Sequence, residues 1–154
     1  MRFKHLVDLI TPFLKEHNIN LGYQRKGCKK QGHYKEYYQD NKVIKKEILI
    51  EQDENDAGKV YVLIHELTHV INNHLHDKTL TKPQKEVVAD QVAKHFINKW
   101  ELINDIKTSN IYKEQDLLAY SQKWLNNRQF SDKKSEIINK QIEYSIYIIN
   151  QLVE

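Results

Sequence analysis

Apolar residues recur at helical spacing over most of the chain, and runs rich in β-branched and aromatic residues occur between residues 34 and 50. The spacing over residues 2–17 predicts an amphipathic helix, whereas the three glycines of residues 22–35 predict loops. Further helices are expected at about residues 59–76, 83–100, 113–126 and 132–152. β-Branched and aromatic residues favour strands at 34–38 and 43–50. A helix, short strands and then helices predict an α+β fold.

The composition is typical of a soluble globular domain, because 40% of the 154 residues are hydrophobic and 29% are charged. No apolar run reaches the roughly 18 residues of a transmembrane helix, so we expect no membrane insertion. The first residues lack the apolar core of a signal peptide, and the cytoplasm is therefore the expected compartment. The net charge of +3 is too small to predict nucleic-acid binding by itself.

The segment most informative about function is residues 63–71, which contains the pattern His-Glu-x-x-His. On a helix, His65 and His69 lie on one face, so that both imidazoles can bind one Zn²⁺ ion. Glu66 lies at the rim of that face, where its carboxylate can take a proton from a zinc-bound water. The apolar stripe of this helix points to nearly the opposite side, so the histidines are not core residues.

A catalytic zinc site normally has three protein ligands and an open position. The longer pattern that adds a glycine and a third histidine is absent, since Asn72 and Leu75 occupy those positions. Glu86 and Asp90 share one face of the next helix, at the edge of its apolar stripe, where an unpaired carboxylate is costly. This helix is therefore the better place for a third ligand, because zinc would supply the partner that such a carboxylate needs. Asp90 can accept a hydrogen bond from the distal nitrogen of a zinc-binding histidine.

Over about residues 30–100, the chain resembles the ImmA/IrrE-type metallopeptidases. The resemblance rests on three segments, namely the strand at 45–50, His65-Glu66-x-x-His69 and Glu86-x-x-Ala89-Asp90-x-x-Ala93. Thr68 stands where the family commonly has glycine, and Asp90 stands where asparagine is commoner. Neither difference removes a ligand.

This resemblance implies a zinc-dependent endopeptidase in which zinc is bound by His65, His69 and Glu86, with Glu66 as the catalytic base. It implies a zincin-like core, a short antiparallel sheet packed on the two ligand helices. Family members act on helix-turn-helix repressors of mobile elements, prophages or stress responses, so such a repressor is the expected substrate. We assign this peptidase domain to residues 1–108. Residues 109–154 are expected to be C-terminal helices that pack on the core and help to recognise the substrate.

Several features of the site stay open at the level of sequence. A substrate segment could add as a strand to the sheet edge near Ile48–Ile50. Another donor must help zinc to stabilise the oxyanion. The candidates are Tyr34, Tyr37, His33 and His74. His74 and His76 otherwise fit exposed or supporting positions at the end of the His-Glu-x-x-His helix.

Two other functions are consistent with parts of the sequence. Peptide deformylases also use His-Glu-x-x-His with an upstream cysteine, and Cys28 is upstream, but the surrounding deformylase motifs are missing. Residues 25–46 interleave eight basic residues with three tyrosines, a pattern that can bind a nucleic-acid backbone or an acidic protein. The chain could then be a regulatory binding module that keeps a zinc site. We regard this region as more typical of a solvated hairpin.

Overall fold

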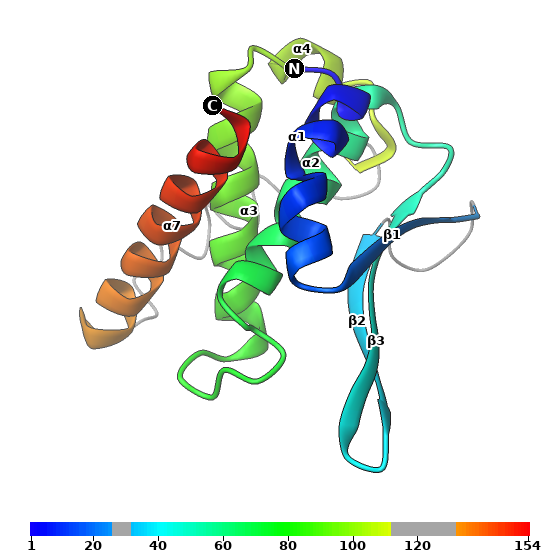
Figure 1. Cartoon of the computed structure of the whole chain (residues 1–154). Helices are drawn as coiled ribbons and strands as arrows, with labels where there is room; N and C mark the ends of the chain where they lie inside the picture. The colour runs from blue at the N-terminus through cyan, green and yellow to red at the C-terminus, as the bar shows by residue number, and fades with distance from the viewer. Residues whose placement is uncertain (26–31, 112–131) are drawn as a thin grey trace.

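The computed structural model describes residues 1–25, 32–111 and 132–154. Its described elements follow the order helix, three strands and four helices (Figure 1). They are α1 (Phe3–Glu16), β1 (Ile19–Gln24), β2 (Gly32–Gln39), β3 (Lys42–Glu51), α2 (Asp56–Ile71), α3 (Lys82–Lys99), α4 (Ile103–Ile106) and α7 (Asp132–Val153). The predicted α+β class is confirmed, and Pro12 does not interrupt α1. The helix expected at 113–126 and Cys28 lie outside the described residues.

The strands form one sheet in the order β1-β3-β2. β1 pairs parallel to β3 and β2 pairs antiparallel to it, so the sheet is mixed and not purely antiparallel as expected. Loops were also expected at residues 22–35, but Gly22 lies within β1. Asp40 and Asn41 have φ of 51° and 61°, which gives the tight turn whose twist suits a two-residue hairpin.

The central position of β3 overturns one expectation about substrate binding. The segment Ile48–Ile50 pairs with β1 on one side and with β2 on the other. Its backbone groups are therefore already used within the sheet, and no further strand can add there. Within the described sheet, the outer edges belong to β1 and β2.

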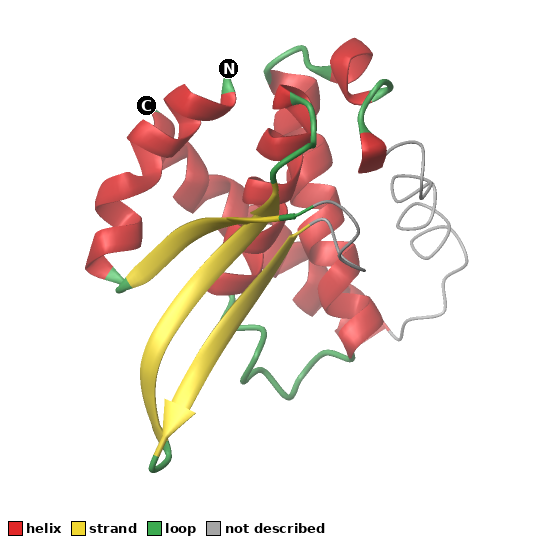
Figure 2. Cartoon of the chain, turned by 90° about the vertical axis from the view of Figure 1, so that its right-hand side faces the viewer, coloured by secondary structure: helices red, strands yellow, loops and turns green. Residues whose placement is uncertain are grey.

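The helices cover one face of the sheet, and the β2–β3 hairpin extends beyond them (Figure 2). One hydrophobic core joins α1, the inner sheet face, α2, α3 and α7, and it includes Leu6, Ile48, Leu63, Phe96 and Ile149. No described helix combines the length and apolar character that crossing a bilayer requires. The core places α2 centrally, between the sheet and the other long helices.

The two central helices begin and end at clear sequence signals. The Asn55 side chain accepts from Gly58 N–H at the start of α2, and Thr81 forms a capping box at the start of α3. The helix expected to reach His76 ends at Ile71, because Asn73 adopts the left-handed conformation at φ 51°. Asparagine tolerates that conformation better than most residues, so Asn73 ends the helix as glycine often does.

Candidate metal centre

Helices α2 and α3 bring three ligand-type atoms to one point. His65 Nε2 lies 3.0 Å from Glu86 Oε2, and His69 Nε2 lies 3.3 Å from Glu86 Oε1. The two imidazole Nε2 atoms are 3.2 Å apart. The structure thus unites the two histidines of α2 with the carboxylate predicted as their partner on α3. In the described part of the chain, these three residues form the one such group that could hold a metal ion.

These spacings fit a small tetrahedral metal ion. Zinc–nitrogen and zinc–oxygen bonds of about 2.0–2.1 Å separate two ligand atoms of a tetrahedron by roughly 3.3 Å. All three distances in the cluster, 3.0, 3.2 and 3.3 Å, lie near that value. Two imidazoles and one carboxylate also leave a fourth position for water or substrate. The residues present therefore fit a catalytic metal.

Close packing between α2 and α3 makes this convergence possible. Ala89 and Ala93 are fully buried, as expected for small residues that let two helices approach. The side chains of His65 and His69 are each 12% exposed, whereas that of Glu86 is 41% exposed. The histidine face of α2 is thus covered mainly by protein. Access from solvent is on the Glu86 side of the cluster.

Asp90 lies on the other side of His65 from Glu86. Its Oδ1 lies 2.9 Å from His65 Nδ1 and accepts the Tyr61 hydroxyl at 3.0 Å. Tyr61 and Asp90 are both buried. Sequence reasoning proposed the contact of Asp90 with a histidine but missed Tyr61. The signal was available, since Tyr61 is one helical turn before His65 on the same face.

The charges of the cluster reinforce one another. Burial alone would lower the pKa of His65, but Asp90 and Glu86 outweigh it and raise that pKa well above its ordinary value. Burial alone would raise the pKa of Glu86, but the two histidines hold it far below the usual carboxyl range. Glu86 is therefore ionised, and the cluster attracts positive charge, whether as protons or as a metal ion. Metal binding should then release a proton from the His65 imidazole.

Glu66 is buried beside the cluster, with 7% of its surface exposed. Its charge contributes to the raised pKa of His65, which places the carboxylate within electrostatic reach of the ligands. Thr68, at the position where the resembled family has glycine, is buried and donates its hydroxyl to the Ile64 carbonyl at 2.8 Å. The hydroxyl thus stays within α2, and threonine does not disturb the ligand face.

The candidate oxyanion donors are not all free to act. The hydroxyls of Tyr34 and Tyr37 donate to Glu36 and Glu47, at 2.8 and 2.5 Å. His74, expected at an exposed or supporting position, is buried, and its Nδ1 lies 2.8 Å from Nδ1 of His69. It therefore lies behind His69, away from the metal-facing nitrogen. Burial lowers the pKa of His74 to about 4.

A comparison with known families agrees with this geometry. The model of peptidase family M78, described as the IrrE N-terminal-like domain, matches residues 14–133, well over half of the chain. The chain belongs to the M78 peptidase family. No curated protein and no solved structure matches it.

Membership of the M78 family makes this chain a metal-dependent peptidase by descent. It also accounts for the fold, since a small sheet beside several helices is consistent with the zincin-like architecture of M78 peptidases. The family match includes β1 to α4, and so every residue of the cluster described above. The identity of the metal and the role of each residue rest on the site itself.

Proposed function

We propose that this M78 peptidase is a zinc-dependent endopeptidase whose ligands are His65, His69 and Glu86. The observation that carries the proposal is the convergence of three ligand atoms from two helices at 3.0–3.3 Å. Imidazole and carboxylate are ligands that suit Zn²⁺, and their number leaves one open position.

The chemistry is that of water attacking a peptide bond. Zinc, when bound, polarises the scissile carbonyl and lowers the pKa of water towards about 7. Glu66 takes the proton of the attacking water and passes it to the leaving amine. Asp90 and Tyr61 support His65 from behind, and so keep its ring oriented towards the ligand cluster.

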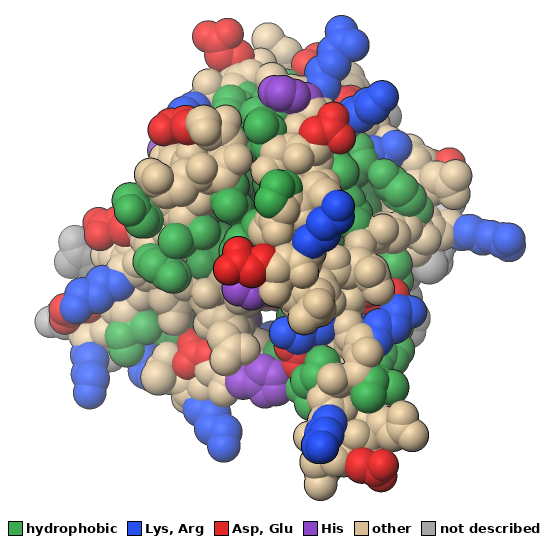
Figure 3. All heavy atoms as spheres, viewed as in Figure 1, with side chains coloured by type: hydrophobic (Ala, Val, Ile, Leu, Met, Phe, Trp, Pro, Cys, Tyr) green, Lys and Arg blue, Asp and Glu red, His purple; other side chains and the backbone are tan. Residues whose placement is uncertain are grey.

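The proposed substrate is a regulatory protein, a helix-turn-helix repressor of a mobile element, prophage or stress response. This proposal rests on the resemblance to ImmA/IrrE-type peptidases. The hairpin supports a protein substrate, because Tyr38, Val43 and Ile44 expose apolar surface at the side of the helical body. Figure 3 shows hydrophobic and basic side chains interspersed on the projecting hairpin.

We also propose that an extended substrate segment aligns along β2 rather than β3. β2 carries an outer edge of the described sheet, and it begins close to α2, where a Cβ on Gly32 would lie 2.1 Å from Val62 Cγ1. Tyr38 and Glu36 link the same strand to His76, which follows the end of α2. Backbone pairing with β2 would therefore place a substrate beside the metal helix.

Nucleic-acid binding through residues 25–46 is the second candidate function. Against it, the described tyrosines of this region donate their hydroxyls to Glu36 or Glu47, so each lies beside a carboxylate that repels phosphate. Retention of the protein on a DNA column at increasing salt tests this candidate. Binding that weakens steeply with salt would favour nucleic-acid binding, and weak or salt-independent retention would exclude it.

The first test of the proposed function compares the zinc content of the purified wild-type chain with that of two variants. We expect about one zinc per wild-type chain, a clear loss in Glu86→Ala, and no loss in Glu143→Ala, which removes an exposed carboxylate from α7. Zinc that is absent from the wild type, or unaffected by Glu86→Ala, would contradict the assigned ligand set.

The second test concerns the substrate. The helix-turn-helix protein encoded nearest to this chain's gene is incubated with the zinc-loaded enzyme, and fragments are identified by mass spectrometry. We expect discrete cleavage that a chelator abolishes. An intact repressor, together with a zinc-loaded enzyme, would contradict the substrate but not the metal site. A generic casein assay is less informative, because peptidases of regulatory proteins are selective.

A further inference from the structure

The chain reverses direction directly after α2 and returns a third histidine, His74, to a position behind His69. With Asn73 in the left-handed conformation, the His74 N–H donates to the His69 carbonyl at 3.0 Å, and the Asn73 N–H donates to the Val70 carbonyl at 3.0 Å. This pair of bonds defines a Schellman motif. It carries His74, five residues after His69, back against the ring of His69, with ring centroids 5.0 Å apart.

Metal binding fixes the direction of the hydrogen bond between these rings. His69 presents Nε2 to the ligand cluster, and a metal needs the lone pair of that nitrogen. A neutral His69 must then carry its hydrogen on Nδ1. That N–H faces Nδ1 of His74 at 2.8 Å, so His74 Nδ1 has to be the acceptor.

The same reasoning continues outward to the C-terminal helix. A neutral His74 that accepts at Nδ1 carries its hydrogen on Nε2, which lies 2.7 Å from Oε1 of Gln141 on α7. The amide nitrogen of Gln141 in turn donates to Asp77 Oδ2 at 3.2 Å. Every donor in this chain of contacts thus meets an acceptor, in the one arrangement that leaves His69 Nε2 free for a metal.

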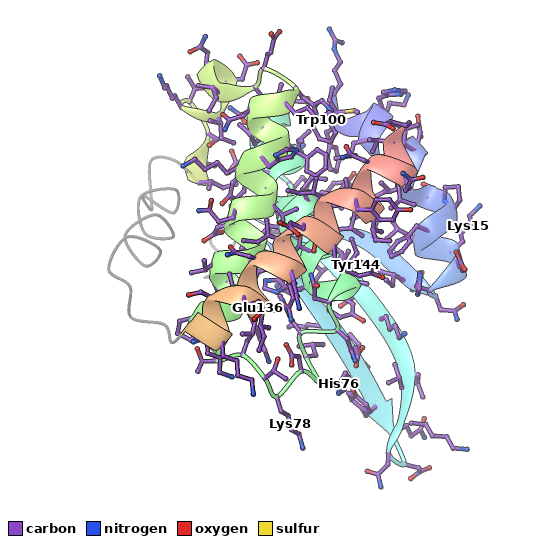
Figure 4. All side chains as sticks on the ribbon, turned by 90° about the vertical axis from the view of Figure 1, so that its left-hand side faces the viewer. Lys15, His76, Lys78, Trp100, Glu136 and Tyr144 are labelled. Carbon is purple, nitrogen blue, oxygen red and sulfur yellow. The ribbon has the colours of Figure 1, made fainter. Side chains whose placement is uncertain are left out.

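The surrounding structure holds this arrangement in place. Lys85, the residue before Glu86 on α3, donates to the carbonyls of His74 and Asp77 at 2.6 Å each. Figure 4 shows α7 lying across α3, with the loop that carries His76 and Lys78 between α7 and the hairpin. The loop after α2 is thus fixed from α3 and from α7 at once.

We propose that His74 and Gln141 are positioning residues of the metal centre, through which α7 sets the tautomer and orientation of His69. This inference rests on the proposed metal site but not on peptide cleavage. It makes the two histidine ligands unequal, because His65 is supported by the carboxylate of Asp90 and His69 by a neutral histidine. A carboxylate strengthens a histidine ligand by its charge, whereas a neutral acceptor mainly orients it.

The test measures the Kd for zinc by chelator competition on the full-length chain. His74→Leu removes the acceptor, and we expect the Kd to rise about 10- to 100-fold. His74→Asn keeps an acceptor oxygen near the position of Nδ1 and should recover most of the affinity. Gln141→Ala should give a smaller rise than His74→Leu. The visible absorption of the Co²⁺-loaded protein should shift in His74→Leu.

Ser145→Ala is the matched control. Ser145 is also a buried polar residue of α7, and its hydroxyl accepts from Asn72 Nδ2 at 2.7 Å, so it too links α7 to the end of α2. Its hydroxyl donates to the backbone carbonyl of Gln141 at 2.7 Å and not to the Gln141 side chain that reaches His74. Ser145→Ala should therefore lower thermal stability by breaking that link, yet leave both the Kd for zinc and the Co²⁺ spectrum unchanged.

The outcomes separate this inference from the proposed function. If wild-type protein binds zinc and His74→Leu binds it as tightly as Ser145→Ala does, the positioning role is wrong while the metal site stands. If the wild type binds no zinc, both fail. If His74→Leu does not fold, the Kd values for zinc of Gln141→Ala and Ser145→Ala are compared instead. Equal Kd values would overturn the positioning role, and weaker zinc binding by Gln141→Ala would support it.

Discussion

The side chains of the metal centre lie between two buried helix faces, whereas those of the β2–β3 hairpin stand largely in solvent. Tyr61 and Asp90 are both almost wholly buried behind His65, while Ile44 near the hairpin tip is 61% exposed. A position fixed by packing suits metal ligands, which must hold their geometry. An exposed apolar arm suits contact with another protein.

The hairpin also differs in how it is attached. Beyond the sheet core, its contact with the loop after α2 is polar, with His76 Nε2 at 2.8 Å from the Glu36 carboxylate and at 3.0 Å from the Tyr38 hydroxyl. The Glu36 side chain is 7% exposed, whereas that of His76 is 47% exposed. Each such contact contributes little, because solvent reaches the half-exposed His76 and screens its charge. Metal binding and substrate handling should therefore be separable by substitution, with large effects in the helices and small ones on the hairpin.

The largest effect is expected from Glu66→Gln in the helical region. Losing the proton acceptor should reduce the rate of repressor cleavage by about 10²- to 10⁴-fold. Zinc content should remain that of the wild type, because Glu66 is not among the three ligands. Cleavage kinetics and metal analysis on one preparation check both. Cleavage near the wild-type rate would show that another group takes the proton.

The next largest effect concerns stability. Leu63→Ala empties a fully buried position of α2 and should lower the free energy of unfolding by about 2–5 kcal/mol. The control Ile44→Ala on the exposed hairpin should change it by less than about 0.5 kcal/mol. Urea denaturation measures both. Equal losses would mean that the hairpin tip belongs to the same packed core as α2.

Much of the helical region could be predicted from sequence, because its signals are local and periodic. The spacing of His65 and His69, and of Glu86 and Asp90, already defines which side chains share a helix face. Thr81 and Pro83 likewise indicate where α3 begins. The family match confirms the resemblance and the fold, whereas the residue roles and the split at residue 108 remain predictions.

Other features depend on contacts that no local pattern reveals. The parallel pairing of β1 with β3 joins segments more than 20 residues apart, so sequence could not show that β3 is central. Gln141 reaches His74 across 67 positions of the chain. The early end of α2 was predictable in principle, since Asn72 and Asn73 are a helix-ending pair, but the apolar spacing that continues beyond them concealed it.

A smaller effect is expected at the start of the metal helix. A Cβ on Gly58 would lie 2.3 Å from Glu54 Cγ, and the Glu54 carboxylate accepts from the N–H groups of Asn55, Asn110 and Ile111. Gly58→Ala should therefore displace this buried carboxylate and cost about 1–3 kcal/mol of stability.

The matched control for this substitution is Gly22→Ala in the sheet. A Cβ there would lie 2.9 Å from the Leu49 Cδ2 atom, the end of a side chain that can move. Its cost should be clearly smaller than that of Gly58→Ala in the same thermal unfolding experiment. A larger loss for Gly22→Ala would show that β1 tolerates less change than the start of α2.

The smallest effect is expected at Glu36, where the hairpin meets the loop after α2. Burial raises the pKa of Glu36, but hydrogen bonds from Tyr38, His76 and Tyr34 lower it by more than burial raises it. The net shift of this pKa is therefore downward from 4.5. A carboxyl with a lowered pKa stabilises the fold above its ordinary pKa, and this contribution is lost as the pH falls through the lowered value.

At pH 7, Glu36→Gln should cost roughly 0.2–1 kcal/mol of folding free energy. The difference from wild type in urea denaturation should shrink as the pH falls below 4.5, and Tyr38→Phe, which removes one of the three donors, should show a part of it. A difference that stays constant with pH would mean that the Glu36 contacts act by shape and not by charge, and the hairpin would then be attached more rigidly than its exposure indicates.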